Sequence, residues 1–392
     1  MRPLEGIKVV TFEHAIAAPF CTRQLADLGA RVIKVERPGV GDFARNYDER
    51  VSGLASHFVW TNRSKESITL DVKQPAALEV VHKLLADSDV FVQNLAPGAT
   101  QRLGLDYDAL RERYPRLIVC DISGYGLDGP FRDKKAYDLL IQSESGFLSI
   151  TGSEGEPAKA GCSIADIAAG MYGYTNILAA LIERGRTGRG RHIDVSMLES
   201  MVEWMTYPLY YAIDGQSAPR QTGASHATIF PYGPFKAGDG KTVMLGLQNE
   251  REWKSFCETV LRQPDVTKDE RFCSNSRRVA NREGLVQIIA QTFEALTAAQ
   301  VIDRLEEAGI ANARMNDMQA VWEHKQLVAR NRWTKVGTPA GDIPALCPPG
   351  VSLADEPRMD PVPALGQHTD MVLSELGYTD NQIGALHETG AV

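Results

Sequence analysis

The chain has 392 residues, enough for about two or three domains, and an ordinary composition with 43% hydrophobic and 23% charged residues. Its 42 basic and 50 acidic residues give a net charge of -8, which argues against a nucleic-acid surface as its main function. The six cysteines show no CxxC and no Cys/His ligand spacing, so we expect no metal site, no disulfide framework and a cytoplasmic location. Because no signal peptide and no apolar run of about 18 residues is present, we expect no membrane association.

The first half of the sequence alternates between strand and helix patterns. We expect buried strands at 7–12, 31–36, 90–93, 117–121 and 191–195. Helices are expected at 19–28, 75–87, 107–114, from 138, at 163–184 and at 197–213, with a long polar loop over 39–63. Strands separated by helices in this rhythm predict an α/β fold with a Rossmann-like parallel sheet.

The second half loses this rhythm. A turn-rich stretch over 214–234 precedes a hairpin at 235–245, helices at 252–260, 282–293 and 298–308, a proline-rich segment without a clear period at 336–365, and a terminal helix from 371. We therefore expect a large domain whose N-terminal part is 1–213, an inserted smaller α+β domain at 225–325, and a C-terminal segment at 330–392 that returns to the large domain.

The sequence lacks the common phosphate-binding loops. The residues after the first strand are Glu13-His-Ala-Ile-Ala-Ala-Pro19 instead of G-x-G-x-x-G, and the glycine-rich stretch 185–190 lacks the lysine of a P-loop. We expect no nucleotide triphosphate site. An enzyme that moves an already activated acyl group needs none, whereas one that activates carboxylates with ATP does.

Polar residues follow three of the expected strands. His14, Arg37 and Asn94 each come just after a strand, and the carboxyl ends of parallel strands meet at one edge, so these residues are candidates for a shared crevice. Lys134 and Lys135 could contact phosphate or be solvated. The loop 225–234, which contains His226 and Tyr232, could face a substrate or connect domains.

Asp166 is the most informative single residue. It should lie in the first turn of the helix at 163–184, where free backbone N–H groups and the helix dipole favour an ionised carboxylate, as a nucleophile requires. The spacing Ser163-x-x-Asp166 also nearly matches a capping box, in which the acid only satisfies a backbone donor. The local pattern leaves both interpretations open.

Motifs spread over nearly the whole chain resemble the class III coenzyme A transferases, whose relatives include formyl-CoA:oxalate transferase, carnitine CoA-transferase and the α-methylacyl-CoA racemases. They include Pro3-Leu-Glu-Gly-Ile-Lys-Val-Val, Leu28-Gly-Ala-Arg-Val-Ile-Lys-Val-Glu-Arg37, Asn62-Arg-Ser-Lys-Glu-Ser-Ile-Thr-Leu70, Asn94-Leu-Ala-Pro-Gly and Leu365-Gly-Gln-His-Thr-Asp. The order and spacing of these motifs carry the resemblance.

The resemblance implies a mechanism and a set of site residues. Asp166 matches the family's nucleophile, which exchanges one thioester for another through an aspartyl covalent intermediate, with acyl-CoA as a substrate. The positions that match those holding coenzyme A are Ile16, Ala17, Arg37, Leu70, Asp71, Val72, Lys73, Asn94, Leu95, Ala96, Arg102, Lys135, Ala136, Tyr137 and Asp138. His14, His226 and Tyr232 are candidate contacts to the carboxylic acid. The resemblance also implies an interlocked homodimer.

Two sequence features distinguish between the activities found among these relatives. In the racemases a histidine stands at the position of Tyr137, and a tyrosine with a pKa near 10 is a poor base at pH 7, so transfer is favoured over isomerisation. The loop 225–234 is similar to that of relatives that act on malate, citramalate, mesaconate or itaconate. We expect transfer of CoA from an acyl-CoA such as succinyl-CoA to a short dicarboxylic acid, within one molecule or between two. The alternatives are a racemase-type isomerase and a non-catalytic CoA-binding protein.

Overall fold

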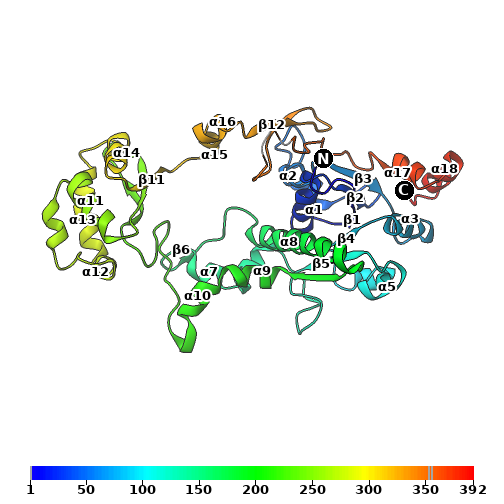
Figure 1. The fold of residues 1–392 in the computed structure, drawn as a ribbon, viewed down its shortest axis with the longest axis horizontal. Coiled ribbons are helices and arrows are strands. Elements are labelled where there is room, and N and C mark those ends of the chain that lie inside the picture. Colours follow the sequence, from blue (N-terminus) through cyan, green and yellow to red (C-terminus); the bar gives the residue numbers. More distant parts are fainter. Residues whose placement is uncertain (1, 352–353, 355) are drawn as a thin grey trace. The chain divides into compact units, whose positions relative to one another are not determined.

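The computed structural model describes residues 2–351, 354 and 356–392 and has the predicted α/β fold (Figure 1). The chain divides into two compact units. Unit 1 comprises Met1–Gly146, Ala160–Thr206 and Lys325–Val392, and unit 2 comprises Phe147–Lys159 and Tyr207–His324. Each unit is described by itself below.

Unit 1 contains the predicted parallel sheet. Its strands are β1 (Lys8–Phe12), β2 (Arg31–Glu36), β3 (Lys65–Thr69), β4 (Val90–Gln93), β5 (Ile118–Ser123) and β8 (His192–Ser196). They lie in the order β3-β2-β1-β4-β5-β8, and every neighbouring pair is parallel. Strands such as β4, buried along its whole length, are apolar on both faces because helices cover both sides.

Strand β3 was not predicted from the sequence, because Lys65-Glu-Ser-Ile-Thr69 is too polar for an obvious strand. Two of its polar side chains are nevertheless buried. Lys65 is 3% exposed and lies 2.6 Å from Glu13, while Ser67 is fully buried and donates to Glu36 at 2.5 Å. Contacts of Lys65 and Ser67 with residues distant in the sequence therefore stabilise β3, although its sequence lacks an apolar strand pattern.

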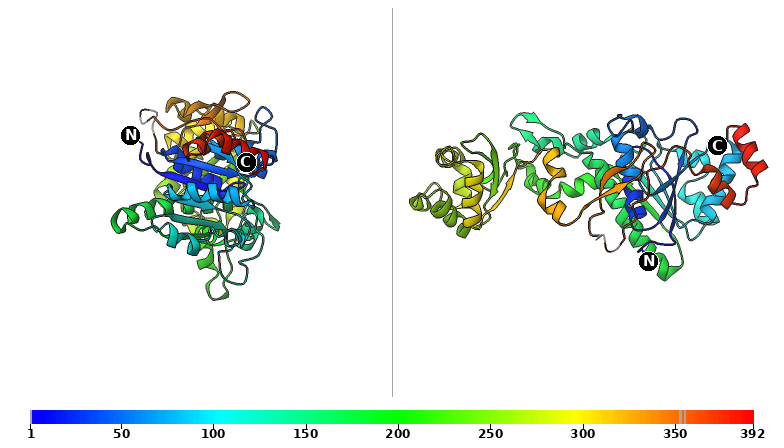
Figure 2. Two further views of the ribbon diagram at one scale, coloured as in Figure 1. Left: turned by 90° about the vertical axis from the view of Figure 1, so that its right-hand side faces the viewer. Right: turned by 90° about the horizontal axis from the view of Figure 1, so that it is seen from above.

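Helices cover both faces of the sheet (Figures 1 and 2). On one face, α1 (Ala17–Asp27) packs against α8 (Ile164–Thr187), which contacts β5 and β8. On the other face, α3 (Pro75–Ala86), α5 (Tyr107–Arg113), α17 (Thr369–Glu375) and α18 (Asp380–Glu388) bury apolar side chains against the sheet. Helix α8 continues three residues beyond the predicted end at Arg184, and Gly188 closes it with a φ of 72°.

The remaining helices of unit 1 lie in its connections. They are α2 (Ser56–Asn62), α4 (Ala99–Leu103), α6 (Asp138–Glu144), α9 (Met197–Trp204) and α16 (Lys325–Ala329). The expected loop at 39–63 is therefore wrong in part, since it contains α2 and a 3-10 helix at Phe43–Asn46. The many turn residues in this segment indicated a loop, so these short helices were not predicted from the sequence.

The C-terminal segment lies alongside the edge strand β3. His368 donates its backbone N–H to Ser67 O at 2.9 Å, and Thr369 Oγ1 accepts from Thr69 N at 3.0 Å. The proline-rich segment is more ordered than its sequence indicated, because β13 (Ile343–Leu346) pairs with β12 (Trp333–Val336). The terminal helix expected from 371 is the pair α17 and α18.

Unit 2 contains an antiparallel sheet of β9 (Tyr232–Lys236), β10 (Thr242–Gly246) and β11 (Ala311–Arg314) in the order β11-β10-β9. The predicted hairpin is thus confirmed as β9–β10, and β11 adds a strand. The unit's other strands and α-helices are α7 (Phe147–Ile150), β6 (Gly152–Ser153), β7 (Glu156–Pro157), α10 (Thr206–Tyr211, whose first residue belongs to unit 1), α11 (Glu250–Ser255), α12 (Asn275–Ala280), α13 (Arg282–Phe293), α14 (Ala298–Glu307) and α15 (Met318–Trp322). Helices α11, α13 and α14 enclose the unit's core with the sheet.

Two predicted helices differ in detail. The helix expected at 197–213 is broken at Met205 into α9 and α10, because Pro208 has no N–H to donate to Trp204 and its ring would clash with that carbonyl. The helix expected at 252–260 begins at Glu250, where Asn249 caps it, and ends in a π-helical turn at Phe256–Val260.

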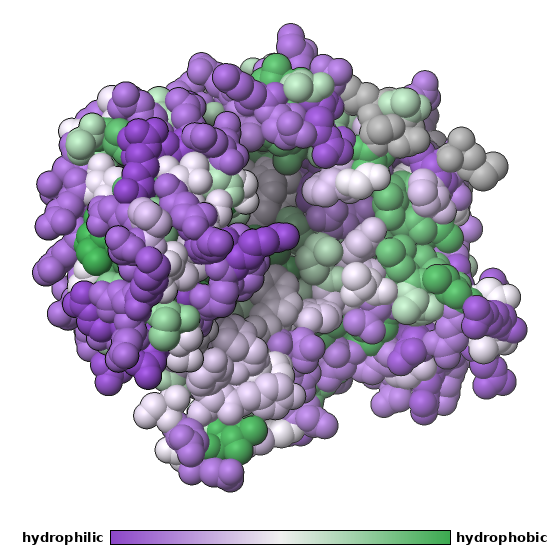
Figure 3. All heavy atoms as spheres, turned by 60° about the vertical axis from the view of Figure 1, so that its left-hand side comes forward, coloured by the Kyte–Doolittle hydropathy of each residue, from purple (hydrophilic) through white to green (hydrophobic). Residues whose placement is uncertain are grey.

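The surface drawn in Figure 3 is mostly hydrophilic, with apolar residues in small groups. Within the described residues, no single helix is long and apolar enough to cross a membrane, although the bent pair α13 and α14 passes a test of length and composition when taken together.

Candidate active site

The order of the parallel strands creates a topological switch point between β1 and β4. From β1 the chain proceeds to β2 and β3 on one side, and from β4 it proceeds to β5 and β8 on the other. At this point His14 N donates to Asn94 Oδ1 at 2.9 Å, and Asn94 Nδ2 donates to His14 O at 2.9 Å. Open parallel sheets bind ligands at such a crevice. The predicted convergence of these two residues is confirmed.

The residue after His14 has an uncommon backbone. Ala15 has a φ of 61°, a conformation that costs a non-glycine residue about 1 kcal/mol or more. Asp42 holds it there, because Asp42 Oδ1 accepts from Ala15 N at 3.1 Å and from Ala44 N at 2.9 Å. Burial alone would raise the pKa of Asp42, but the ammonium of Lys34, 2.7 Å away, the side chain of His14 and the backbone N–H of Ala44 lower it well below its usual range. No local pattern indicated this buried pair.

Close packing between α1 and α8 positions Asp166. A Cβ on Gly170 would lie 2.7 Å from Ala17 O, and one on Gly173 would lie 3.2 Å from Cys21 Sγ, so these glycines let the two helices approach. Gly170 faces Ala17 and Gly173 faces Cys21, so α1 and α8 run in the same direction along this contact. Asp166 precedes Gly170 by one turn on the same face and therefore lies toward the segment before Ala17, which includes His14.

Asp138 caps the helix that carries Asp166. Its Oδ1 accepts from Ala165 N at 2.8 Å and from Asp166 N at 3.4 Å, while its Oδ2 accepts from Gln142 Nε2 at 2.6 Å. Ser163 is the N-cap residue, but its side chain makes no capping hydrogen bond within the described part of the chain. The capping-box interpretation of Ser163 and Asp166 is therefore wrong, because Asp138 from α6 takes the backbone donors.

The electrostatic expectation for Asp166 is also wrong. Burial, followed by the negative charge of Asp138, raises its pKa to about 7, whereas the helix terminus was expected to keep the carboxylate ionised. Because the first N–H groups of α8 already donate to Asp138, they do not stabilise Asp166. A carboxyl group that titrates near neutral pH is more basic than an ordinary aspartate and is a mark of functional sites.

The segment from Lys135 to Asp138 lies against the carboxyl end of β5. A Cβ on Gly124, the residue after β5, would lie 2.2 Å from Ala136 Cβ, so only glycine allows this contact. Tyr137 is 66% exposed and its ring is available to a ligand. The segment thus belongs to the same sheet edge as His14 and Asn94.

Four exposed cations also follow strands at this edge: Arg37 after β2, Lys73 after β3, Arg102 after β4 and Lys135 after β5. Within the described ranges, their side chains form no hydrogen bond or ion pair. Because all these strands are parallel, the connections that carry the four residues start from the same edge of the sheet. They are available to bind anions.

The other predicted coenzyme A positions differ in accessibility. Ile16, Ala17 and Leu70 are buried, so the structure does not present their side chains to a ligand. Val72 and Leu95 are partly buried, Ala96 is exposed, and the backbone N–H of Asp71 donates to Ala391 O at 2.8 Å. Contacts from the buried positions would have to come from the backbone.

Aromatic residues in the 39–63 segment were missed by the sequence reasoning. Phe43 stacks on His14 with ring centres 5.3 Å apart, and Tyr47 contacts Phe43 at 5.8 Å. Burial raises the pKa of Tyr47 to about 12, and the charges of Asp42 and Asp166 add to the shift, which places Tyr47 within electrostatic reach of Asp166. The signal that could have found them is four aromatic side chains, Phe43, Tyr47, Phe58 and Trp60, in a stretch rich in charged and turn residues.

His226 and Tyr232 lie together in unit 2. Their rings stack at 5.2 Å, and His226 Nδ1 accepts from Thr228 N at 3.2 Å and from Ile229 N at 3.1 Å. In the neutral ring the proton must therefore be on Nε2, which leaves that atom as a donor.

Comparison with known proteins decides the family. A family model described as CoA-transferase family III matches residues 4–369. The chain belongs to CoA-transferase family III. As a member of this family, the protein is an enzyme with an acyl-CoA substrate, and the predicted resemblance is confirmed.

Relatives and solved structures of family III match nearly the whole chain. Succinyl-CoA:glutarate CoA-transferase of Homo sapiens is 34% identical, with 100% of this chain and 90% of the relative covered. Succinyl-CoA:mesaconate CoA-transferase of Haloarcula hispanica is 32% identical, with 96% and 97% covered. A crystal structure of a CaiB/BaiF family protein from Brucella suis is 33% identical, has a TM-score of 0.83, and is matched over 96% of this chain and 99% of that one.

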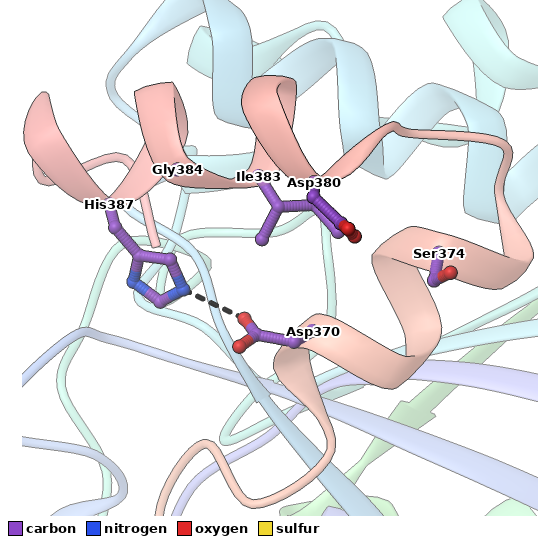
Figure 4. A pocket seen from close by; sticks show the side chains of 6 residues that line it. All are labelled: Asp370, Ser374, Asp380, Ile383, Gly384 and His387. Atoms are coloured by element: carbon purple, nitrogen blue, oxygen red, sulfur yellow. Dashed lines mark hydrogen bonds and ion pairs between the residues drawn. The ribbon is translucent and has the colours of Figure 1, made fainter.

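A surface pocket of this family III chain is lined by none of the predicted site residues. It is formed by α17 and α18 and lined by Asp370, Ser374, Asp380, Ile383, Gly384 and His387 (Figure 4). His387 Nε2 and Asp370 Oδ1 are paired at 2.7 Å. In the part of the chain that the structure describes, no group of three or more His, Cys, Asp or Glu side chains could hold a metal ion.

Proposed function

We propose that this family III enzyme transfers CoA from succinyl-CoA to a four- or five-carbon dicarboxylic acid, through covalent intermediates on Asp166. The observation that carries the proposal is Asp166 itself. It lies in the first turn of α8, one turn before the close contact of Gly170 with Ala17 and toward the switch point, and its pKa is raised to about 7.

In the first half-reaction, the carboxylate of Asp166 attacks the thioester carbonyl of succinyl-CoA. The C–S bond breaks, CoA thiolate leaves with the electron pair, and a mixed anhydride of Asp166 and succinate forms. The thiolate then attacks the aspartyl carbonyl of this anhydride and expels succinate. The enzyme now carries an aspartyl-CoA thioester.

The second half-reaction reverses these steps with another acid. The acceptor carboxylate attacks the aspartyl thioester and releases CoA thiolate, which attacks the acceptor's carbonyl in the new anhydride. The products are the new CoA thioester and free Asp166. One thioester replaces another, so no ATP is consumed, in keeping with the absence of phosphate-loop motifs.

Asp138 has two effects on this chemistry. By accepting from Ala165 N and Asp166 N it fixes the first turn of α8, and its negative charge contributes to the raised pKa of Asp166. A more basic carboxylate is a stronger nucleophile, and a pKa near the working pH still leaves a large ionised fraction.

Coenzyme A would be held at the sheet edge. Its phosphates need cations, and Arg37, Lys73, Arg102 and Lys135 are exposed and leave that edge after four different strands. The reciprocal pair of His14 and Asn94 would support the segment of coenzyme A that approaches Asp166. His226 Nε2 and Tyr232 in unit 2 are proposed contacts to the acceptor acid.

The donor and acceptor are proposed from the relatives. The two relatives described above are named for succinyl-CoA as donor and for glutarate or mesaconate as acceptor. We therefore add glutarate to malate, citramalate, mesaconate and itaconate as candidate acceptors. Transfer between two carboxyl groups of one acid would use the same residues.

We further propose a cytoplasmic homodimer with interlocked chains. In support, all six cysteines are free, and apolar side chains are exposed on α6 and α9 of unit 1 (Leu139, Leu140 and Trp204) and on α10 of unit 2 (Tyr207 and Tyr210). Sedimentation of the purified protein at twice the monomer mass is the expected result.

The direct test mixes the enzyme, succinyl-CoA and each candidate acid, and identifies the CoA esters by mass spectrometry. We expect at least one acid to accept CoA with wild-type enzyme and none with Asp166→Ala. With an acceptor labelled in its carboxylate by oxygen-18, the peptide that contains Asp166 should gain one labelled oxygen in a single turnover. Direct transfer between the acids would leave that peptide unlabelled and would refute the covalent role of Asp166.

Isomerisation is tested separately, with a branched acyl-CoA as the substrate. In heavy water, a racemase-type enzyme would incorporate deuterium at the α-carbon of a branched acyl-CoA at the rate of turnover. We expect no such exchange, since Tyr137 stands at the position where the resemblance to the racemases implies a basic histidine.

A further inference from the structure

Three adjacent strands contribute to a line of hydrogen bonds that ends on the loop after β4. His192 Nε2 on β8 lies 2.6 Å from Asp121 Oδ2 on β5, and Asp121 Oδ1 accepts from Gln93 Nε2 on β4 at 2.8 Å. Gln93 Oε1 in turn accepts from the backbone N–H of Leu95 at 2.7 Å. None of these three side chains is used in the proposed chemistry.

Each group in this line of hydrogen bonds can act only as donor or only as acceptor. The carboxylate of Asp121 can only accept, so it requires the NH2 group of Gln93, and the N–H of Leu95 then requires the amide oxygen of Gln93. The ring of Tyr107 on α5 stacks on His192 at 4.7 Å with an interplanar angle of 7°, which holds the first member in place.

Because these side chains are buried, any hydrogen bond missing from this line would lower the stability of the fold. Gln93 is 6% exposed and Asp121 is 5% exposed, and burying such groups without partners costs about 1–3 kcal/mol each. An apolar pair would fill the same space without that requirement. The chain instead places polar groups where they fix one peptide of the loop.

We propose that Gln93 and Asp121 are positioning residues for coenzyme A binding. They hold the Leu95 amide, and with it the loop Asn94–Ala96, in the orientation that pairs Asn94 with His14 at the switch point. This inference rests on the proposed coenzyme A site at that edge.

A polarity-reversed double variant tests the proposal. In Gln93→Glu two carboxylates face each other in place of the bond between Gln93 and Asp121, and their repulsion pushes the side chain at position 93 away from Leu95 N. When Gln93→Glu is combined with Asp121→Asn, the new amide NH2 at position 121 can donate to the new carboxylate at position 93. That carboxylate can still accept from Leu95 N, and the amide oxygen at position 121 can accept from His192. The control is Gln101→Glu on α4, which adds the same charge to an exposed position close to the loop.

The measurements are the dissociation constant of free CoA by calorimetry, and KM and kcat for succinyl-CoA. We expect Gln93→Glu to weaken CoA binding and raise KM at least about tenfold more than Gln101→Glu, with kcat within about twofold of wild type. The double variant should bind CoA within about threefold of wild type.

Equal CoA binding by Gln93→Glu and Gln101→Glu would overturn the inference, as would a loss confined to kcat. If Gln93→Glu does not fold, the double variant decides: CoA binding close to wild type supports the proposal, and weak binding by the folded double variant or failure of that variant to fold refutes it. If wild-type enzyme itself does not bind CoA, the proposed function fails instead.

Discussion

The raised pKa of Asp166 predicts a specific effect of Asp166→Asn on stability. A pKa of about 7 in the folded protein, against an ordinary value of 3.8, means that folding favours the protonated carboxyl. The wild type therefore loses stability as pH rises from about 4, and the loss is complete above about pH 7. Asparagine mimics the protonated form and escapes this loss.

The magnitude follows from the size of the shift. Each pH unit corresponds to about 1.4 kcal/mol, and the difference is about three units, so Asp166→Asn should raise the free energy of unfolding by up to about 4 kcal/mol at pH 8.5. At pH 5 the gain should be only about 1–2 kcal/mol, because pH 5 lies only about one unit above the ordinary pKa, where the loss of stability begins.

Urea unfolding at pH 5 and pH 8.5 measures the difference. The control is Asp303→Asn, a change at an exposed aspartate on α14, for which we expect the same small effect at both pH values. If the gain from Asp166→Asn does not increase between pH 5 and pH 8.5, the assigned burial and repulsion by Asp138 are wrong. Loss of transferase activity in the same variant checks the catalytic proposal separately.

Three further predictions follow from individual contacts. Asp138→Asn removes a negative charge beside Asp166 and should move the rising limb of the kcat/KM pH profile to lower pH; a profile that stays in place or moves upward would contradict the coupling. Gly170→Ala should lower the free energy of unfolding by about 1–3 kcal/mol, because the new Cβ would press on Ala17 O. The control is Gly185→Ala on the same helix, where the space around the residue is open, and it should raise the free energy of unfolding by up to about 1 kcal/mol. Thermal or urea unfolding measures both changes. Arg37→Ala should raise KM for succinyl-CoA about tenfold with little change in kcat, and the salt dependence of KM should become weaker; an unchanged KM would remove Arg37 from the anion site.

The sequence predicted the elements whose pattern is local. Apolar runs identified β1, β2, β4 and β5, and helical spacing identified α3 and α8. The predicted end-of-strand meeting of His14 and Asn94 holds because parallel strands bring their carboxyl ends to one edge. Family motifs then identified the class of enzyme, which the geometry of isolated residues could not have done.

The sequence did not reveal arrangements that depend on distant partners. β3 was missed because Lys65 and Ser67 are buried only through Glu13 and Glu36. Residues 39–63 were expected to form a loop, and the positions of Phe43 and Tyr47 became evident only in the fold.

The sequence by itself determined that Asp166 stands at the start of a helix in an α/β chain, because helical spacing and first-turn position are local properties. Only the tertiary structure decided the state of its carboxyl group. Asp138, distant along the chain, takes the backbone donors that the helix start would have offered, and burial then raises the pKa of Asp166 to about 7. The local sequence pattern determines where a charged residue lies along a helix or strand. Folding determines which groups surround that residue, and these groups determine the free energy of its ionised form.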